Sequence, residues 1–179
     1  MGYCMGRGSL KTEYMGTRHI TEVKLGGELK VSQYGQWDGY PEGQGLTIAK
    51  FLRGVDLEKF KRQVQALGIY TAKDIEQAYL DAGAEKGARW VNMDVSDKVK
   101  ERHPALSRDY GAGVLQLIHD GVMTRVVLEK EFKNDSLMCE YVYTIDLDNE
   151  TVQIGSKKYP FKEWTSELME KLTRDEARN

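Results

Sequence analysis

The side chains best suited to chemistry or recognition lie in one glycine-rich segment between residues 34 and 45. It carries three aromatic rings and two carboxylates, on Tyr34, Trp37, Asp38, Tyr40 and Glu42. Aromatic and polar side chains on a rigid loop form a common type of binding surface. The sequence therefore predicts a binding site here. The alternative is a structural connector, in which the glycines supply positive φ angles and Trp37 fills the core.

The two carboxylates of this segment, Asp38 and Glu42, could act as general acid and base or bind a divalent cation. The sequence shows no third ligand, and no pair of histidines has the close spacing of a zinc helix. The segment also lacks the lysine followed by serine or threonine that is typical of a phosphate-binding loop. We therefore expect neither a metal site nor a cofactor.

Arg18 and His19 are further candidates for the same binding site, because they lie in a strand expected to neighbour the one that leads into the loop. Thr17 is a candidate nucleophile. Its position before a hairpin resembles the layout of amino-terminal-nucleophile hydrolases, in which a freed α-amine serves as the base. That chemistry would require removal of residues 1–16. Whether the protein is an enzyme stays open at this point, and a function without catalysis is favoured.

Two hairpin strands and a block of helices are expected to position these residues. Residues 17–25 and 28–34 alternate on either side of Gly26 and Gly27, which predicts a β-hairpin. Residues 35–45 are expected to have no regular structure. Apolar residues at helical spacing, with caps at Asp56, Thr71 and Ser96, predict helices within residues 48–54, 57–67, 72–83, 96–103 and 114–121.

The carboxyl-terminal part returns to a period of two. Strands are expected within residues 122–128, 137–147 and 151–155, followed by a final helix over residues 161–172. Runs of strands beside runs of helices predict an α+β fold, with an antiparallel sheet of two amino-terminal and three later strands. The 179 residues suit one domain, expected over residues 15–179 after an arm or leader of residues 1–14.

Composition narrows the choice of partners. The formal net charge of −2 gives no overall attraction to phosphate backbones or acidic lipids, so direct nucleic-acid binding is not expected. No apolar run approaches the roughly 20 residues that span a bilayer. The two cysteines are far apart in sequence, which favours free thiols in a reducing compartment. We therefore expect a cytoplasmic protein without a membrane partner.

Three stretches resemble a family of proteins of unassigned activity from phages, prophages and other microbial genomes. They are MGTRHIT at residues 15–21, QYGQWDGYPEGQG at residues 33–45 and CEYVYTIDLD at residues 139–148. Members of that family usually start at the equivalent of Met15, so residues 1–14 depart from its pattern. The resemblance carries over no catalytic residue.

The resemblance implies a phage or mobile-element setting, where small proteins without catalytic motifs often inhibit bacterial defence, as anti-CRISPR proteins do. The expected partner is then a bacterial defence protein or ribonucleoprotein complex in the host cytoplasm, bound through the loop. Two alternatives stay open, the hydrolase described above and a module that binds a small ligand or nucleotide through the same aromatic residues. The oligomeric state is also open.

Overall fold

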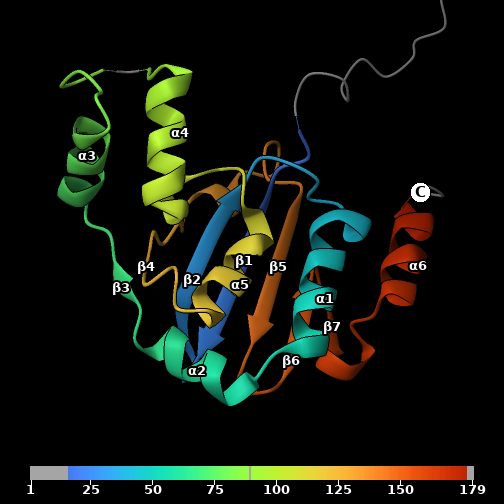
Figure 1. The fold of residues 1–179 in the computed structure, drawn as a ribbon. Helices are drawn as coiled ribbons and strands as arrows, with labels where there is room; N and C mark the ends of the chain where they lie inside the picture. The colour runs from blue at the N-terminus through green and yellow to red at the C-terminus, as the bar shows by residue number, and fades with distance from the viewer. Residues whose placement is uncertain (1–15, 89, 177–179) are drawn as a thin grey trace, which may run out of the picture.

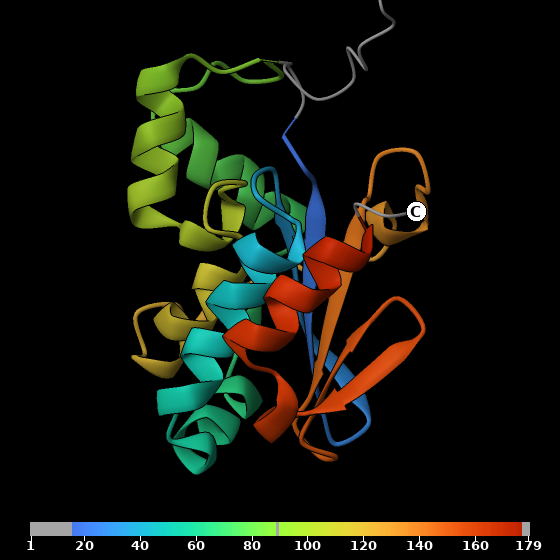
Figure 2. The same cartoon turned by 90° about the vertical axis from the view of Figure 1, so that its right-hand side faces the viewer.

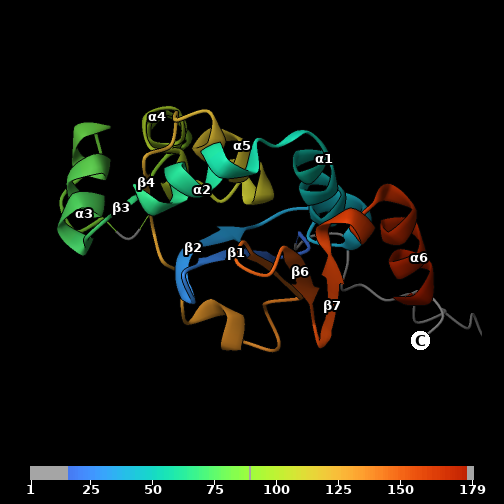
Figure 3. The ribbon, with the colours of Figure 1, turned by 90° about the horizontal axis from the view of Figure 1, so that it is seen from below.

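The centre of the protein is a five-stranded sheet in the order β2-β1-β5-β6-β7 (Figure 1). The computed structural model describes residues 16–88 and 90–176, so the expected arm over residues 1–14 lies outside the described residues. The strands are β1 (His19–Leu25), β2 (Glu28–Gly35), β5 (Tyr141–Asp146), β6 (Thr151–Ile154) and β7 (Lys157–Pro160). Helices pack on one face of this sheet and beside its edges (Figure 3), and the α+β prediction is confirmed.

Pairing in the sheet is mostly antiparallel. β1 and β2 form the predicted hairpin, and Gly26 and Gly27 adopt the positive φ angles, 63° and 73°, that its turn requires. β5, however, runs parallel to β1, with His19 opposite Tyr141. The expectation of purely antiparallel pairing is wrong at this contact. The block of helices between β2 and β5 provides the long crossover that parallel neighbours need.

One expected strand lies outside the central sheet. Within residues 122–128 only β4 (Arg125–Val126) forms, and it pairs with β3 (Gly68–Ile69) in a separate two-stranded sheet. The fifth strand of the central sheet is instead β7, an edge strand that ends at Pro160. Its lysine-rich sequence has no apolar alternation, because an edge strand with little buried surface needs none.

Three helices cover one face of the sheet, as the view along it shows (Figure 3). They are α1 (Leu46–Gly54), α2 (Leu57–Gln65) and α5 (Val114–His119). Their apolar residues, including Phe60, Leu115 and Ile118, form one core with Val31 and Tyr143 of the sheet. The last helix, α6 (Ser166–Glu176), lies beside α1 near the β6–β7 edge and begins later than the expected residue 161 (Figure 2).

The segment between β4 and β5 crosses the opposite face of the sheet (Figure 3). It includes one turn of 3-10 helix at Phe132–Asn134. Lys133 donates a hydrogen bond of 2.7 Å to the carboxylate of Glu22, which is buried and also accepts a hydrogen bond from Thr144. This pairing satisfies a charge that would otherwise be costly at the centre of a sheet.

Helices α3 (Ala72–Asp81) and α4 (Met93–Arg102) form a separate pair beside β2, with a small core of their own (Figure 1). Thr71 and Asp74 make the predicted capping box at the start of α3. The cap of α4 is Asn92, whose side chain accepts a 2.9 Å hydrogen bond from Val95 N. The expectation of a cap at Ser96 is therefore wrong, because an equally suitable side chain lies one turn earlier.

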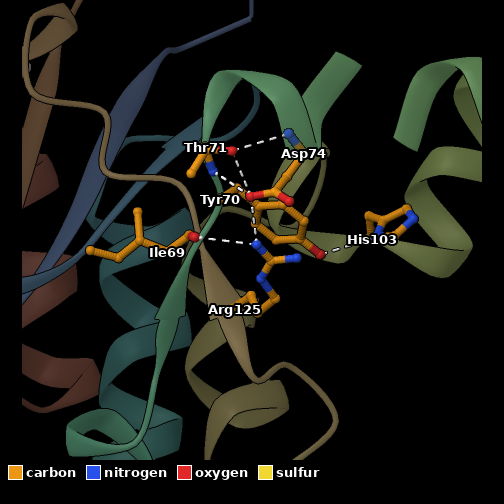
Figure 4. Close-up of polar contacts among 6 residues, drawn as sticks. All are labelled: Ile69, Tyr70, Thr71, Asp74, His103 and Arg125. Carbon is orange, nitrogen blue, oxygen red and sulfur yellow. Dashed lines mark hydrogen bonds and ion pairs between the residues drawn. The ribbon is translucent and has the colours of Figure 1, made fainter. Parts of the chain in front are cut away.

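Arg125 connects this helical pair to the body of the protein (Figure 4). Its guanidinium donates to the Asp74 carboxylate at 2.7 Å and to the Ile69 carbonyl at 3.3 Å, and lies 4.2 Å from the centre of the Tyr70 ring. Hydrogen bonds from Thr71, followed by the contribution of Arg125, lower the pKa of Asp74 to about 2. The carboxylate thus serves as cap and ion-pair partner together.

We expect the change Arg125→Met to loosen α3 while leaving the main core intact, because methionine keeps the apolar stem and loses the guanidinium. Amide hydrogen exchange in α3 should become roughly threefold to tenfold faster, and exchange in α2 should not change. The matched control is Lys98→Met, which removes an ion pair within α4. Equal exchange rates in wild type and Arg125→Met would contradict this role of Arg125.

Candidate functional site

Residues 36–40 form a loop that backbone hydrogen bonds hold on both sides. Gly39 N donates to the Thr17 carbonyl at 2.9 Å, and Gln36 N donates to the Arg108 carbonyl at 2.9 Å. Asp38 adopts a φ of 54°, which is uncommon for a residue other than glycine. These contacts come from parts of the chain distant in sequence, so the loop conformation depends on the tertiary fold.

The second half of the segment is helical. Pro41–Gly45 forms a turn of π-helix that continues directly into α1, which corrects the expectation of no regular structure. Proline is favoured at the start of a helix, and the glycines permit close packing. If Gly43 carried a side chain, its Cβ atom would lie 2.1 Å from the carbonyl oxygen of Asp38. A Cβ atom on Gly45 would lie 2.6 Å from Met169 Sδ. Turns of this kind are frequent at functional sites.

Two core side chains hold this segment from below. The Tyr143 hydroxyl donates a 2.6 Å hydrogen bond to the Gly39 carbonyl, and the Trp164 indole donates a 3.0 Å hydrogen bond to the Gly45 carbonyl. Both contacts are buried, where hydrogen bonds are little weakened by competing water. The segment is thus fixed to the sheet and to the residues before α6.

The exposed part of the segment is the aromatic loop surface, which we define as Trp37, Asp38 and Tyr40. Trp37 is 45% exposed, and its indole nitrogen donates to the Asp109 carboxylate at 3.1 Å. Lys100 of α4 holds the other oxygen of Asp109 at 2.9 Å. Tyr40 is 38% exposed, and its hydroxyl lies 3.3 Å from Asp38, whose charge raises the pKa of Tyr40.

The other two residues predicted in this segment lie apart from each other. Tyr34 is half-buried and meets Phe132 edge to face at 4.8 Å, and its hydroxyl donates to Gln36 at 2.5 Å. It therefore belongs to the face of the sheet that the segment before β5 covers. Glu42 is exposed in the first helical turn, where a carboxylate complements the helix dipole.

His19 lies beneath the loop and is fully buried. Glycines pack closely around its imidazole. A Cβ atom on Gly35 would lie 2.1 Å from Cε1 of His19, and a Cβ atom on Gly111 would lie 2.7 Å from Nε2. Neither ring nitrogen makes a hydrogen bond of good geometry to a described residue, although the nearby Thr17 carbonyl favours the protonated ring. Burial prevails and lowers the pKa of His19 to about 4, so the ring is neutral at pH 7.

Arg18 is also buried, at 9% exposure, and its guanidinium points to Met138 Sδ at 3.4 Å. The expectation that Arg18 and His19 touch a binding partner does not agree with these positions, because neither side chain reaches the aromatic loop surface. His19 instead packs beneath the loop, and Arg18 contacts the segment before β5. Thr17 lies two residues before β1, half-buried, and its carbonyl accepts the hydrogen bond from Gly39 N described above.

Asp109 and Lys100 belong to the site, although sequence analysis did not identify them. They follow Trp37 in sequence by 72 and 63 residues, and nothing in their local sequence distinguishes them from other surface charges. In residues 16–88 and 90–176, no group of three or more histidine, cysteine, aspartate or glutamate side chains could hold a metal ion. Cys139 is a free thiol, and Cys4 lies outside the described residues.

No family model matches the sequence, and comparisons with curated proteins and with solved structures also find no match. Within the described part of the chain, no helix has the length and apolar character needed to cross a membrane. The geometry of the aromatic loop surface therefore carries the functional interpretation. It presents a fixed, half-exposed indole beside a phenol and carboxylates, which suits recognition of another molecule.

Proposed function

We propose that this protein acts by binding another protein through the aromatic loop surface. The strongest support is the position of Trp37. This residue is 45% exposed, and its indole nitrogen donates a hydrogen bond to Asp109, which orders the ring. Tryptophan and tyrosine are the residues that most often dominate the binding energy of protein interfaces. A side chain ordered in advance loses less conformational entropy on binding.

The partner that we propose is a bacterial defence protein or ribonucleoprotein complex, which binding would inhibit in the host cytoplasm. The resemblance of three sequence stretches to proteins of phages and prophages supports this choice. Charge supports it as well, because Asp38 follows Trp37 directly and Glu42 lies close enough to Tyr40 to affect its pKa, and both carboxylates are exposed. Carboxylates around an aromatic anchor complement the basic surfaces with which nucleic-acid-binding complexes hold their substrates.

The hydrolase alternative has less support. Thr17 would need a free α-amine and open surroundings, whereas its carbonyl anchors Gly39 and the neighbouring His19 is sealed by glycines. An intact-mass measurement of the purified protein tests this alternative directly. A mature chain that starts at Thr17, together with activity lost in Thr17→Ala, would favour the hydrolase over the binding protein.

Phage plating on bacteria whose CRISPR system targets that phage tests the proposed function. Expression of the wild-type protein should raise the number of plaques that the phage forms on these bacteria. Trp37→Ala should weaken binding to the purified target complex at least about tenfold, as expected for an interface anchor. The matched control is Trp90→Ala, because Trp90 is 91% exposed on a different part of the surface. If Trp37→Ala inhibits as strongly as wild type, the aromatic loop surface is not the contact.

A further inference from the structure

A cavity of about 610 Å³ lies away from the aromatic loop surface. The end of α6, the turn between β6 and β7 and the start of β5 surround it, and Figure 2 shows these elements. Val142, Ile154 and Leu172 provide an apolar lining. Cavities of roughly 300 to 1,000 Å³ with mostly apolar walls and a few polar groups are typical of small-molecule sites.

Next to this cavity, no strand of the described residues pairs with the start of β5 on the side that faces β6. β5 pairs with β6 only as far as Tyr143 opposite Ile154, because the chain turns away at Gly155, which has a φ of 55°. Tyr141 N donates instead toward β1, to the Arg18 carbonyl at 3.3 Å. Successive residues of a strand direct their backbone groups to opposite sides, so the N–H and C=O of Val142 point to the cavity side.

The charged side chains that line the cavity are mostly acidic. They comprise three carboxylates and one ammonium group, on Glu140, Asp175, Glu176 and Lys157. The Tyr141 hydroxyl donates to Glu176 Oε2 at 2.6 Å, and Arg18 N donates to Glu140 Oε1 at 3.3 Å. Within residues 16–88 and 90–176, these contacts orient two of the carboxylates through one oxygen each, and a carboxylate can accept further hydrogen bonds.

From this combination we propose that the cavity binds a small primary amine with an apolar body. The ammonium group would lie between the carboxylates of Glu140 and Glu176, with the Val142 carbonyl as a further acceptor. The body of the ligand would pack on Ile154 and Leu172. An ammonium group carries three donors and complements the acidic lining, whereas an anionic ligand of the same shape would be repelled.

The proposal is tested by titrating the full chain with 4-phenylbutylamine at low salt and recording ¹H–¹⁵N NMR spectra at each concentration. The matched probe is 4-phenylbutyrate, which has the same apolar body and the opposite charge. We expect saturable shifts of the Val142, Gly155 and Leu172 amides with the amine, at an affinity at least about tenfold higher than that for the acid. No saturable shift, equal binding of both probes, or shifts that map elsewhere would overturn the proposal.

The double variant Glu140→Gln and Glu176→Gln keeps the shape of both side chains and removes both charges. Its affinity for the amine should fall at least about tenfold, while the control variant Glu101→Gln, on the exposed face of α4, should bind as wild type. Equal melting temperatures of the three proteins establish that folding is unaffected. A double variant that binds the amine as tightly as wild type would overturn the assignment. Trp37→Ala should not alter amine binding, which separates this site from the proposed protein contact.

Discussion

Replacement of Gly35 by alanine is expected to lower the free energy of unfolding by about 3 kcal/mol, the upper part of the range for overpacked cores. The new Cβ atom would lie 2.1 Å from His19 Cε1, far inside the contact distance. The imidazole cannot move aside easily, because Gly111 also packs closely against it: a Cβ atom built on Gly111 would lie 2.7 Å from His19 Nε2. Urea denaturation of wild type and variant at pH 7 measures the effect.

A double-mutant cycle shows whether the imidazole is the cause. His19→Ala removes the ring, so Gly35→Ala should cost much less in that background, with a coupling energy of about 1 to 3 kcal/mol. Gly54→Ala is the matched control, since open space surrounds a Cβ there, and it should change stability by less than about 1 kcal/mol. Additive effects of the two changes would show that Gly35 is required for another reason.

Stability should also fall steeply between neutral and acidic pH because of His19. Its pKa is lowered from 6.5 to about 4, first by burial, against the opposing effects of the Thr17 carbonyl and Asp38. As pH falls, the unfolded chain therefore takes up the proton before the folded chain does. The stability from a neutral, buried His19 is complete above pH 6.5 and is lost as pH falls toward 4, amounting to about 3 kcal/mol.

Urea denaturation at several pH values between 7 and 4 measures this dependence. His19→Gln cannot titrate in that range, so its stability should fall less with pH than that of wild type. His103→Gln is the matched control, because it removes a half-buried histidine at the end of α4 that is paired with Tyr70 and lies far from the loop in sequence. Identical pH dependence of wild type and His19→Gln would mean that the ring is not held neutral by burial.

Local sequence predicted the elements whose stabilising contacts lie within a few residues. The hairpin of β1 and β2 follows from alternation on both sides of Gly26 and Gly27. Helices α2 and α3 begin where Asp56 and Thr71 accept hydrogen bonds from backbone groups three residues later. The loop between two such residues is short, so little conformational entropy is lost when they come into contact. These contacts can therefore be predicted without knowing the rest of the fold.

Elements that depend on distant partners were not predictable in the same way. The alternating residues 122–128 have the pattern of a central strand, yet they form only the two-residue strand Arg125–Val126, paired with β3, and a single bridge from Leu128 to Ser32 of β2. β7 lacks alternation and still completes the sheet beside β6. A strand is stabilised by its neighbours in the sheet, so its position depends on which other segments of the chain lie beside it.

The sequence by itself determined the α+β class, the first hairpin and the concentration of aromatic and acidic residues at 34–45. Only the tertiary structure decided which of these side chains face outward. Trp37 is half-exposed in the orientation that its hydrogen bond to Asp109 fixes. His19 is buried because Gly35 and Gly111 pack against its ring. The physical reason is that exposure depends on contacts between distant segments, such as Trp37 with Asp109, 72 residues later. These contacts form only after the chain has folded and the intervening loop has closed.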